Sequence, residues 1–202
     1  MAQEIERKFL LSALPALDGL VGERIIQGYV AKEAGAMTTR VRIRSDQAFV
    51  TLKGPSVGMA RDEYEYAIPV DDAEEILGRY CQERIVCKTR YLLEHQGVTY
   101  EIDVFAGRHA GLVVAEVELA CASQALDLPS WIGKEVTDDA RFGNYTLAML
   151  DGSPEAKWWL DEGPRYLDFE KCCCRLLGRL SCCQHANFHL QLAPAIKQIA
   201  TL

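Results

Sequence analysis

Apolar and polar side chains alternate along eight short segments in the first 120 residues of the chain. A period of two is typical of β-strands, whose successive side chains point to opposite faces. Turn-forming pairs such as Ser45-Asp46 and Gln96-Gly97 separate neighbouring segments and predict antiparallel hairpins, as in a barrel or a sandwich. The predicted strands cover residues 3–10, 24–31, 38–45, 47–53, 61–69, 85–94, 98–105 and 112–120.

Helices are predicted at only three places. Asp71, with Glu74 three residues later, resembles a capping box and predicts a helix over 72–82. A short helical turn is expected within residues 12–20. The spacing of apolar side chains predicts a further helix over 139–150.

Charged residues share one face of nearly every predicted strand, because residues two apart point the same way. A solvated outer face is the plainer interpretation of any single strand. The repeated placement of like charges side by side argues against it, because such neighbours repel each other unless a counter-ion binds. The charged sets are Glu4, Glu6 and Lys8; Arg40, Arg42 and Arg44; Lys53; Glu63 and Glu65; Lys88 and Arg90; Glu101 and Asp103; and Glu116 and Glu118.

A closed barrel with these faces turned inward accounts for the whole set. The lumen of an eight-stranded barrel has room for side chains or one small ligand. Buried unpaired charges cost roughly several kcal/mol per ion, so such a lumen must hold water and counter-ions. Arginine and lysine suit phosphate oxygens, and paired carboxylates suit a hard cation such as Mg²⁺ or Mn²⁺. Both together predict a metal-bound polyphosphate.

Composition and net charge argue against several classes of protein. The net charge of -7 argues against a nucleic-acid partner, which would need a broad basic surface. No apolar run approaches the roughly 20 residues of a membrane helix, and Glu4 and Glu6 interrupt any N-terminal secretory signal. A cytoplasmic protein without a membrane partner is expected. His95 and His109 fall in predicted turns, which argues against a histidine-based zinc site.

Nine short motifs follow one another along residues 1–150. They are Glu4-Ile5-Glu6-Arg7-Lys8, Gln27-Gly28-Tyr29, Arg40-Val41-Arg42-Ile43-Arg44, Leu52-Lys53-Gly54, Glu63-Tyr64-Glu65-Tyr66, Lys88-Thr89-Arg90-Tyr91, Glu101-Ile102-Asp103-Val104-Phe105, Glu116-Val117-Glu118-Leu119 and Gly133-Lys134-Glu135-Val136-Thr137. In this order they resemble the CYTH family, the triphosphate tunnel metalloenzymes. The first motif is similar to the ExExK signature of the family, which is a weak pattern alone; the ordered series is specific.

The resemblance implies a fold and a set of roles. The fold would be α+β and mainly β, an eight-stranded antiparallel β-barrel or tunnel with a few covering helices. Residues 1–150 would form the tunnel domain and residues 151–202 a C-terminal extension. The residues implied to hold Mg²⁺ or Mn²⁺ are Glu4, Glu6, Asp103, Glu116 and Glu118. Those implied to bind the triphosphate are Lys8, Arg40, Arg42, Lys53, Arg90 and Lys134.

The resemblance also implies a base and its helpers. Lys88 would activate the attacking water, with Tyr29 assisting it, and a lysine among other cations has a lowered pKa that suits this task. Glu63 and Glu65 would either orient the basic residues or form plain structural ion pairs.

Four activities occur in the family: inorganic triphosphatase, thiamine triphosphatase, class IV adenylyl cyclase and RNA triphosphatase. The short loops and the Gln27-Gly28-Tyr29 segment resemble the small bacterial inorganic triphosphatases most. Metal-dependent hydrolysis of inorganic triphosphate to pyrophosphate and phosphate is therefore expected. A cyclase or a thiamine triphosphatase is the alternative enzyme, and a non-catalytic polyphosphate-binding module is the alternative of another class. The oligomeric state is open, with a homodimer as one option.

The C-terminal extension has no counterpart in the resemblance. Five cysteines between Cys172 and Cys183, together with His185 and His189, do not follow a zinc-binding spacing. Lipidation of these cysteines, a helical cover for the barrel, an unstructured extension and an altered reading frame all remain open. Trp158 and Trp159 would be able to pack onto the apolar exterior of the barrel.

Overall fold

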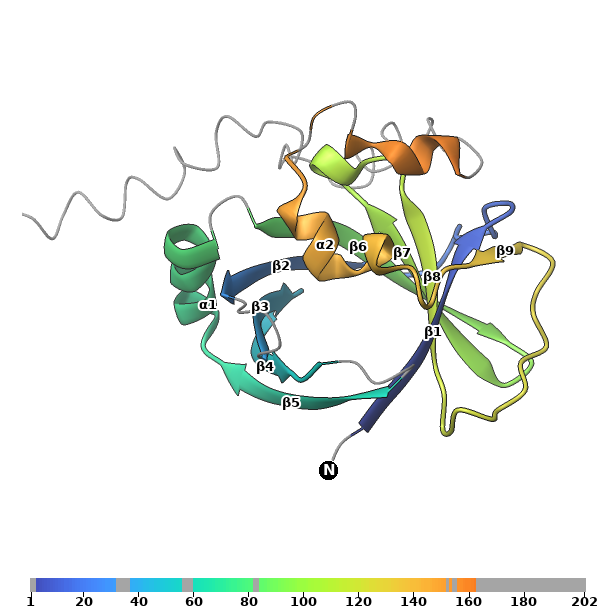
Figure 1. The fold of residues 1–202 in the computed structure, drawn as a ribbon, viewed down its shortest axis with the longest axis horizontal. Helices are drawn as coiled ribbons and strands as arrows, with labels where there is room; N and C mark the ends of the chain where they lie inside the picture. The colour runs from blue at the N-terminus through green and yellow to red at the C-terminus, as the bar shows by residue number, and fades with distance from the viewer. Residues whose placement is uncertain are drawn as a thin grey trace, which may run out of the picture. The chain divides into compact units, whose positions relative to one another are not determined.

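Antiparallel β-strands dominate the computed structural model, which describes residues 3–31, 37–55, 60–81, 84–151, 153 and 156–162 (Figure 1). These residues all belong to one compact unit, residues 1–167, and only the backbone is described for Gln3, Glu4, Ala31, Ala60 and Arg61. The strands within this part of the chain are β1 (Gln3–Leu11), β2 (Glu23–Ala31), β3 (Thr38–Arg44), β4 (Gln47–Lys53), β5 (Ala60–Ile68), β6 (Ile85–His95), β7 (Val98–Phe105), β8 (Val113–Glu118) and β9 (Ile132–Glu135).

The strands form a sheet in the order β5-β4-β3-β2-β6-β7-β8-β1-β9. An additional antiparallel pairing joins β5 to the first residues of β1, with Ile5 opposite Ala60. This pairing brings the two sides of the sheet together, and Figure 1 shows the strands from β1 to β5 curving around a central space. The predicted tunnel of eight antiparallel strands is thereby confirmed, and β9 is an additional strand that pairs with the end of β1.

The tight hairpins fall where the sequence predicted them. Ser45 and Asp46 connect β3 to β4, and Ser45 has a φ angle of 53°. Gln96 and Gly97 connect β6 to β7 with φ angles of 49° and 77°. Positive φ at these positions matches the turns that join strands with a right-handed twist, so the turns fix the register of both hairpins.

The helices differ from their predictions in extent and type. Helix α1 (Val70–Ile76) is followed by a π-helical turn, η1 (Leu77–Cys81), where one helix over 72–82 was expected. Its N-cap is Pro69, with no side-chain capping bond, so the predicted capping box is not formed. Residues 12–20 contain bends and a turn rather than a helix. The predicted helix over 139–150 is a 3₁₀ turn, η3 (Ala140–Phe142), followed by α2 (Asn144–Met149).

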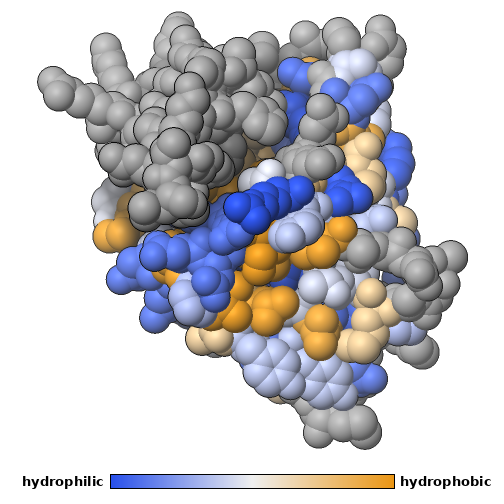
Figure 2. All heavy atoms as spheres, turned by 90° about the vertical axis from the view of Figure 1, so that its left-hand side faces the viewer, coloured by the Kyte–Doolittle hydropathy of each residue, from blue (hydrophilic) through white to orange (hydrophobic). Residues whose placement is uncertain are grey.

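The outward faces of β2, β3 and β4 carry apolar side chains that α1 and η1 cover. Val41, Ala73, Leu77 and Cys81 are buried in this outer cluster. Gly28 allows the close approach, because a Cβ atom there would lie 2.6 Å from Cys81 Cβ. Figure 2 shows that the face on the α1 side still exposes apolar surface between hydrophilic side chains.

A second apolar cluster fills one end of the strands on their inner side. Leu10, Phe105 and Val114 belong to it, and each shares a strand face with a charged residue two positions away. Phe142 and Leu147 pack into the cluster from η3 and α2, and the cluster also takes in the tryptophan pair of η5 (Trp158–Asp161). Trp159 is buried there, and Trp158 packs against Phe142 with ring centroids 4.7 Å apart.

No helix among the described residues is both long and apolar enough to cross a membrane. The 3₁₀ turn η2 (Gly107–His109) connects β7 to β8, and its buried His109 contacts the carbonyl oxygen of Leu147 at 2.7 Å. The histidine therefore joins η2 to α2. The cysteine-rich segment 172–183 and the two histidines that follow it lie outside the described residues.

Candidate active site: a cavity between a basic and an acidic wall

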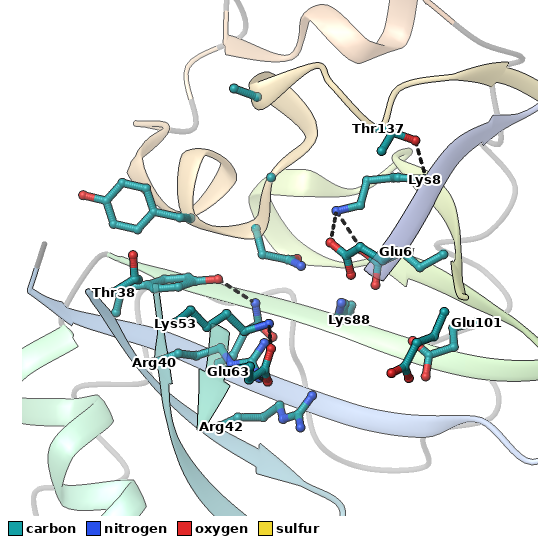
Figure 3. Close-up of a pocket in the computed structure, with 18 of the residues that line it drawn as sticks. Glu6, Lys8, Thr38, Arg40, Arg42, Lys53, Glu63, Lys88, Glu101 and Thr137 are labelled. Carbon is teal, nitrogen blue, oxygen red and sulfur yellow. Dashed lines mark hydrogen bonds and ion pairs between the residues drawn. The ribbon is translucent and has the colours of Figure 1, made fainter. Parts of the chain in front are cut away.

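A cavity of about 540 Å³ occupies the inside of the tunnel. Its lining comes from the inner faces of the strands and from the segment between β9 and α2 (Figure 3). We call the inner faces of β3, β4 and β5 the basic wall and those of β1, β6, β7 and β8 the acidic wall. The charged residues that line the cavity are Arg40, Arg42, Arg44, Lys53 and Glu63 on the basic wall; Glu6, Lys8, Lys88, Arg90, Glu101, Glu116 and Glu118 on the acidic wall; and Asp139 on the connecting segment.

Two arginines of β3 form the centre of the basic wall. Arg40 Nη2 lies 3.1 Å from Thr51 Oγ1 and 3.3 Å from Glu65 Oε2, and Arg42 Nη2 lies 2.9 Å from the same Glu65 oxygen. Thr51 itself donates to Glu65 Oε2 at 2.8 Å. These contacts follow from register, because Arg40 faces Thr51 across β3 and β4, and Thr51 faces Glu65 across β4 and β5.

Not every hydrogen-bond donor of the two arginines is bonded within the described part of the chain. Among the described residues, the buried Nε atoms of Arg40 and Arg42 have no hydrogen-bond partner. Burial, followed by the charge of Arg40, lowers the pKa of Arg42. Burial opposes ionisation of Glu65, but the hydrogen bond from Thr51 and the charges of Arg42 and Arg40 outweigh it, so the pKa of Glu65 is lowered. Buried donors without a partner are costly, which makes an incoming anion a favourable partner.

Lys53 extends the basic wall along β4. Its Nζ atom lies 2.5 Å from Glu63 Oε2, and the two residues face each other across β4 and β5. Arg40 reaches the other oxygen of Glu63 at 3.5 Å. Glu63 and Glu65 therefore hold the three cations side by side with their charged groups toward the cavity (Figure 3).

Arg90 is the organising cation of the acidic wall. Its Nε and Nη2 atoms grip Asp103 at 2.7 and 2.6 Å, and Nη2 also lies 2.7 Å from Glu116 Oε2. Nη1 donates to Glu101. Burial opposes the charge of Arg90, but Asp103, Glu116 and Glu101 outweigh it and raise the pKa of the guanidinium. Four bonds to three carboxylates leave Arg90 few donors for a ligand.

Lys88 lies deeper in the same wall. It is 3% exposed and donates from Nζ to Asp103, a residue with no exposed surface. Burial is the main influence that lowers the pKa of Lys88; the adjacent Arg90 acts in the same direction, and Asp103 opposes both. The lumen-facing lysine is thus held by a carboxylate while its burial favours the neutral amine.

Lys8 bridges two carboxylates at the edge of the acidic wall. Its Nζ atom lies 2.9 Å from Glu116 Oε1 and 3.7 Å from Glu6 Oε1 (Figure 3). Across β1 and β8, Lys8 faces Glu116 and Glu6 faces Glu118. Burial opposes the negative charge of Glu116, but Lys8, Lys88 and Arg90 outweigh it, so the pKa of Glu116 falls well below its usual range.

Aromatic and amide groups occupy the cavity end near α2. Gln27 Nε2 donates to the hydroxyl of Tyr29 at 3.2 Å, and both side chains are buried. Tyr145 from α2 meets the Tyr29 ring edge to face, with centroids 5.3 Å apart. Asn144, the first residue of α2, also lines the cavity. The contacts fix the hydroxyl of Tyr29 at the border between the apolar cluster and the charged lumen.

Most predicted site residues meet in this cavity; two are placed differently, and the side chain of a third is not among those described. Asp103 lies beneath the lining and bonds Lys88 and Arg90, as described above. Lys134 is absent from the lining; its side chain is 60% exposed and pairs with Glu162 at 2.9 Å. The side chain of Glu4 lies outside the described residues. The predicted residues that line the cavity are Glu6, Lys8, Tyr29, Arg40, Arg42, Lys53, Lys88, Arg90, Glu116 and Glu118.

Several lining and supporting residues were not assigned a role from the sequence. Glu101 lines the cavity and bonds Arg90, and its alternation with Asp103 on β7 was the available signal. Burial is the main influence that raises the pKa of Glu101, with Arg90 opposing it. Thr51 is an ordinary strand residue in the sequence, and Gln27 and Asn144 carry no charge pattern. Their positions become visible only when the strands are in register.

A carboxylate donor set suits a hard divalent cation, since such ions prefer oxygen ligands. Glu6, Glu101, Glu116 and Glu118 from three adjacent strands all line the cavity. Among the described side chains, no three of them already converge as a metal site. Glu6 and Glu116 are instead paired with Lys8, and Glu101 and Glu116 with Arg90. The donor chemistry therefore fits a metal ion, and three of the four carboxylates are held by cations of the chain.

This chain is similar to a known protein family and to two inorganic triphosphatases. The family model of the CYTH domain matches residues 2–145. An inorganic triphosphatase of Acetivibrio thermocellus is 41% identical over 147 residues, which are 73% of this chain and 94% of that protein. An inorganic triphosphatase of Nitrosomonas europaea is 40% identical over 150 residues, covering 72% of this chain and 97% of that protein.

Solved structures agree with these relatives. A crystal structure of an inorganic triphosphatase superposes with a TM-score of 0.57 at 37% identity, and the match covers 74% of this chain and 97% of that one. The residues that the CYTH domain model matches run from β1 to the start of α2, and hence include the strands that build both walls of the cavity.

Proposed function

The chain belongs to the CYTH domain family, and from this premise we propose that it is an inorganic triphosphatase. In the proposed reaction, inorganic triphosphate is hydrolysed to pyrophosphate and phosphate inside the tunnel, with Mg²⁺ or Mn²⁺ as the metal. Residues 1–150 would form the domain that carries the activity. Two relatives about 40% identical, both described as inorganic triphosphatases, support the choice of substrate.

The observation that carries the proposal is the pairing of a basic and an acidic wall across one cavity. A volume of about 540 Å³ leaves room for a short polyanion and its counter-ions. Phosphoryl transfer depends mostly on positioning the phosphates and neutralising their charge. Both tasks require cations and metal-binding carboxylates around the same small space.

The basic wall would bind the triphosphate. Arg40 and Arg42 offer their buried Nε donors, and Lys53 adds a third cation beside them. Glu63 and Glu65 keep these side chains in place before the substrate arrives, so little side-chain freedom is lost on binding. Lys8 would contact the phosphates from the opposite wall.

The acidic wall would hold the metal through Glu6, Glu116 and Glu118, with Glu101 as a further oxygen donor. A divalent cation bound there would neutralise phosphate oxygens and raise the acidity of water. Arg90 bonds Glu101, Asp103 and Glu116, and so keeps the carboxylates of Glu101 and Glu116 in place in the lumen.

Lys88 would accept the proton of the attacking water. Its lowered pKa increases the fraction of neutral amine near neutral pH, and a general base works best when its pKa is near the working pH. Asp103 fixes the direction of the amine through its bond to Nζ. Tyr29, whose hydroxyl accepts a hydrogen bond from Gln27, would help to hold the water.

The test is phosphate release from inorganic triphosphate, ATP and thiamine triphosphate, with Mg²⁺ or Mn²⁺ and then with a chelator. We expect metal-dependent turnover of inorganic triphosphate that far exceeds that of the other two. Lys88→Ala should abolish it, whereas Arg79→Ala removes an exposed cation of η1 and should leave it unchanged.

Other outcomes would replace the proposal. Formation of cyclic AMP and pyrophosphate from ATP would make the protein an adenylyl cyclase. Preferred turnover of thiamine triphosphate would change the substrate. Tight binding of triphosphate without turnover under any metal would make the chain a polyphosphate-binding module.

A further inference from the structure

Both carboxylate oxygens of Glu116 are held by cations of the chain itself. Oε1 lies 2.9 Å from Lys8 Nζ, and Oε2 lies 2.7 Å from Arg90 Nη2. The side chain is 10% exposed, so water has little access to compete. A divalent cation that binds Glu116 meets two positive charges already in place, so repulsion between the cations favours displacement of one of these two partners.

Arg90 is the partner that stays. Its planar guanidinium grips Asp103 through two parallel bonds and reaches Glu101 and Glu116 from the same fork. A bidentate pair of this kind fixes the side chain, and its other carboxylates would have to separate if it left. Asp103 has no exposed surface, which makes loss of its arginine costly.

Lys8 is the partner that can leave. Its charge is a single ammonium group at the end of a flexible four-carbon chain. The ammonium lies between Glu116 and Glu6 at 2.9 and 3.7 Å, the second distance being long for an ion pair. The backbone of Lys8 is fixed by a hydrogen bond to Thr137 Oγ1 at 3.1 Å, so only the side chain needs to move.

We propose that Lys8 is an exchangeable counter-ion, which occupies the metal site through Glu6 and Glu116 until a divalent cation displaces it toward the triphosphate. The inference takes its substrate, triphosphate, from the proposed function. It adds that one displacement of Lys8 both completes the metal site and supplies a cation that binds phosphate. It also accounts for the absence, among the described side chains, of three converging ligands.

A thermodynamic coupling follows. Because Lys8 leaves the carboxylates when the metal arrives, the metal increases the affinity for triphosphate, and triphosphate increases the affinity for the metal by the same factor. In the absence of substrate, Lys8 competes with the metal. Removal of its charge should then improve metal binding, the opposite of what a residue that helps to hold the metal would do.

The test is a Mn²⁺ titration of the substrate-free full chain, followed by electron paramagnetic resonance of the unbound ion. Lys8→Met keeps most of the aliphatic stem and removes the charge, and we expect it to bind Mn²⁺ about tenfold more tightly than the wild type. Lys8→Arg keeps the charge and grips both carboxylates more firmly, so it should bind Mn²⁺ no more tightly than the wild type. Thermal unfolding would establish that both variants are folded.

Lys53→Met is the matched control, because it removes the same charge from the same cavity at a residue of the basic wall, where Lys53 pairs with Glu63. Its Mn²⁺ affinity should rise much less than that of Lys8→Met. Equal increases in the Mn²⁺ affinity of both variants would contradict the proposal, because loss of any positive charge from the cavity would then explain the effect. An unchanged or weaker affinity in Lys8→Met would overturn it as well. Triphosphate hydrolysis by the wild type with such a result would leave the proposed function in place.

Discussion

The two walls of the cavity both combine cations with carboxylates and differ in how these charges are paired. On the basic wall, Glu63 and Glu65 hold Arg40, Arg42 and Lys53 from the side, and both arginines keep a buried Nε without a partner among the described residues. On the acidic wall, each oxygen of Glu116 already has a cation of the chain.

The difference shows two ways of preparing a site for a charged ligand. The basic wall is suited to an anion, because its arginines line the cavity and retain donors that gain partners when phosphate binds. The acidic wall is prepared for a cation through occupied carboxylates, so binding there is an exchange. The first arrangement favours rapid capture of the substrate, and the second makes metal binding depend on which ions are already present.

Loss of a carboxylate at the centre of the acidic wall should have the largest effect. Glu116→Gln removes the negative charge that Lys8 and Arg90 share and weakens a proposed metal ligand. We expect triphosphate turnover to fall by about 10³-fold, the upper end for one electrostatic group in an active site. Phosphate release under saturating Mg²⁺ would measure it.

Glu135→Gln is the control for this variant, since Glu135 pairs with Arg7 and is not part of the cavity lining. It should retain the wild-type rate. Similar losses in both variants would mean that the acidic wall has no special part in the reaction.

Replacement of the proposed base separates charge from proton transfer. Lys88→Arg keeps a cation beside Asp103 but cannot lose its proton, so turnover should fall by about 10²-fold. The wild-type rate should rise with pH through a pKa below the ordinary lysine value of about 10.4, because burial lowers the pKa of Lys88. A pH–rate profile of the variant should lack this rise. If the rise persists unchanged, another group is the base.

The same conservative substitution on each wall sharpens the comparison. Arg42→Lys removes a planar donor that faces the substrate, and we expect KM for triphosphate to rise about tenfold with little change in kcat. Arg90→Lys should change KM less and lower the melting temperature more, because Arg90 bonds three carboxylates of the chain. Steady-state kinetics and thermal unfolding of both variants would decide; a reversed order would contradict the division into walls.

The smallest expected effect is a pH dependence of stability from the basic wall. The pKa of Glu65 is lower in the folded protein than in the unfolded chain. Ionised Glu65 therefore stabilises the fold at pH values above its unfolded pKa of about 4.3, and this stabilisation is lost as pH falls through the folded pKa. Glu65→Gln should lower Tm by about 2–4 °C at pH 7, the shift for about 1 kcal/mol in a domain of this size. The difference should shrink in acid. A constant difference down to pH 3 would exclude this origin, and Glu75→Gln on the surface is the control.

The alternation of charges was sufficient to predict the strands and their inward faces. Pairs such as Glu116 and Glu118 mark one face directly, because spacing along a strand fixes direction. The hairpins at Ser45 and Gln96 were predictable for a similar reason, as they depend on local turn chemistry. These features need no knowledge of distant parts of the chain.

Features that depend on strand pairing across the tunnel could not be predicted from the sequence. Strand β9 has four residues and no alternation, and it exists because the end of β1 offers it an edge. Lys134 was assigned to the substrate from its motif, yet its side chain pairs with Glu162. Thr51 becomes important only once β3, β4 and β5 are aligned. The predicted capping box is not formed, because the N-cap of α1 is Pro69 and not a residue with a polar side chain.

The position of β1 has a consequence for how the protein is made. Its residues pair with β5, β8 and β9, so Glu6 meets Glu118 and Phe9 meets Glu135 only after more than half of the chain has been synthesised. Contacts this distant in sequence slow folding, because a long loop must be closed before they form. Glu6 and Lys8 are among the first residues to leave the ribosome, but their partners on β8 are synthesised much later. Assembly of the cavity is therefore a late event in folding, and a nascent chain that stops before β8 lacks the strand that joins β1 to β7 in the acidic wall.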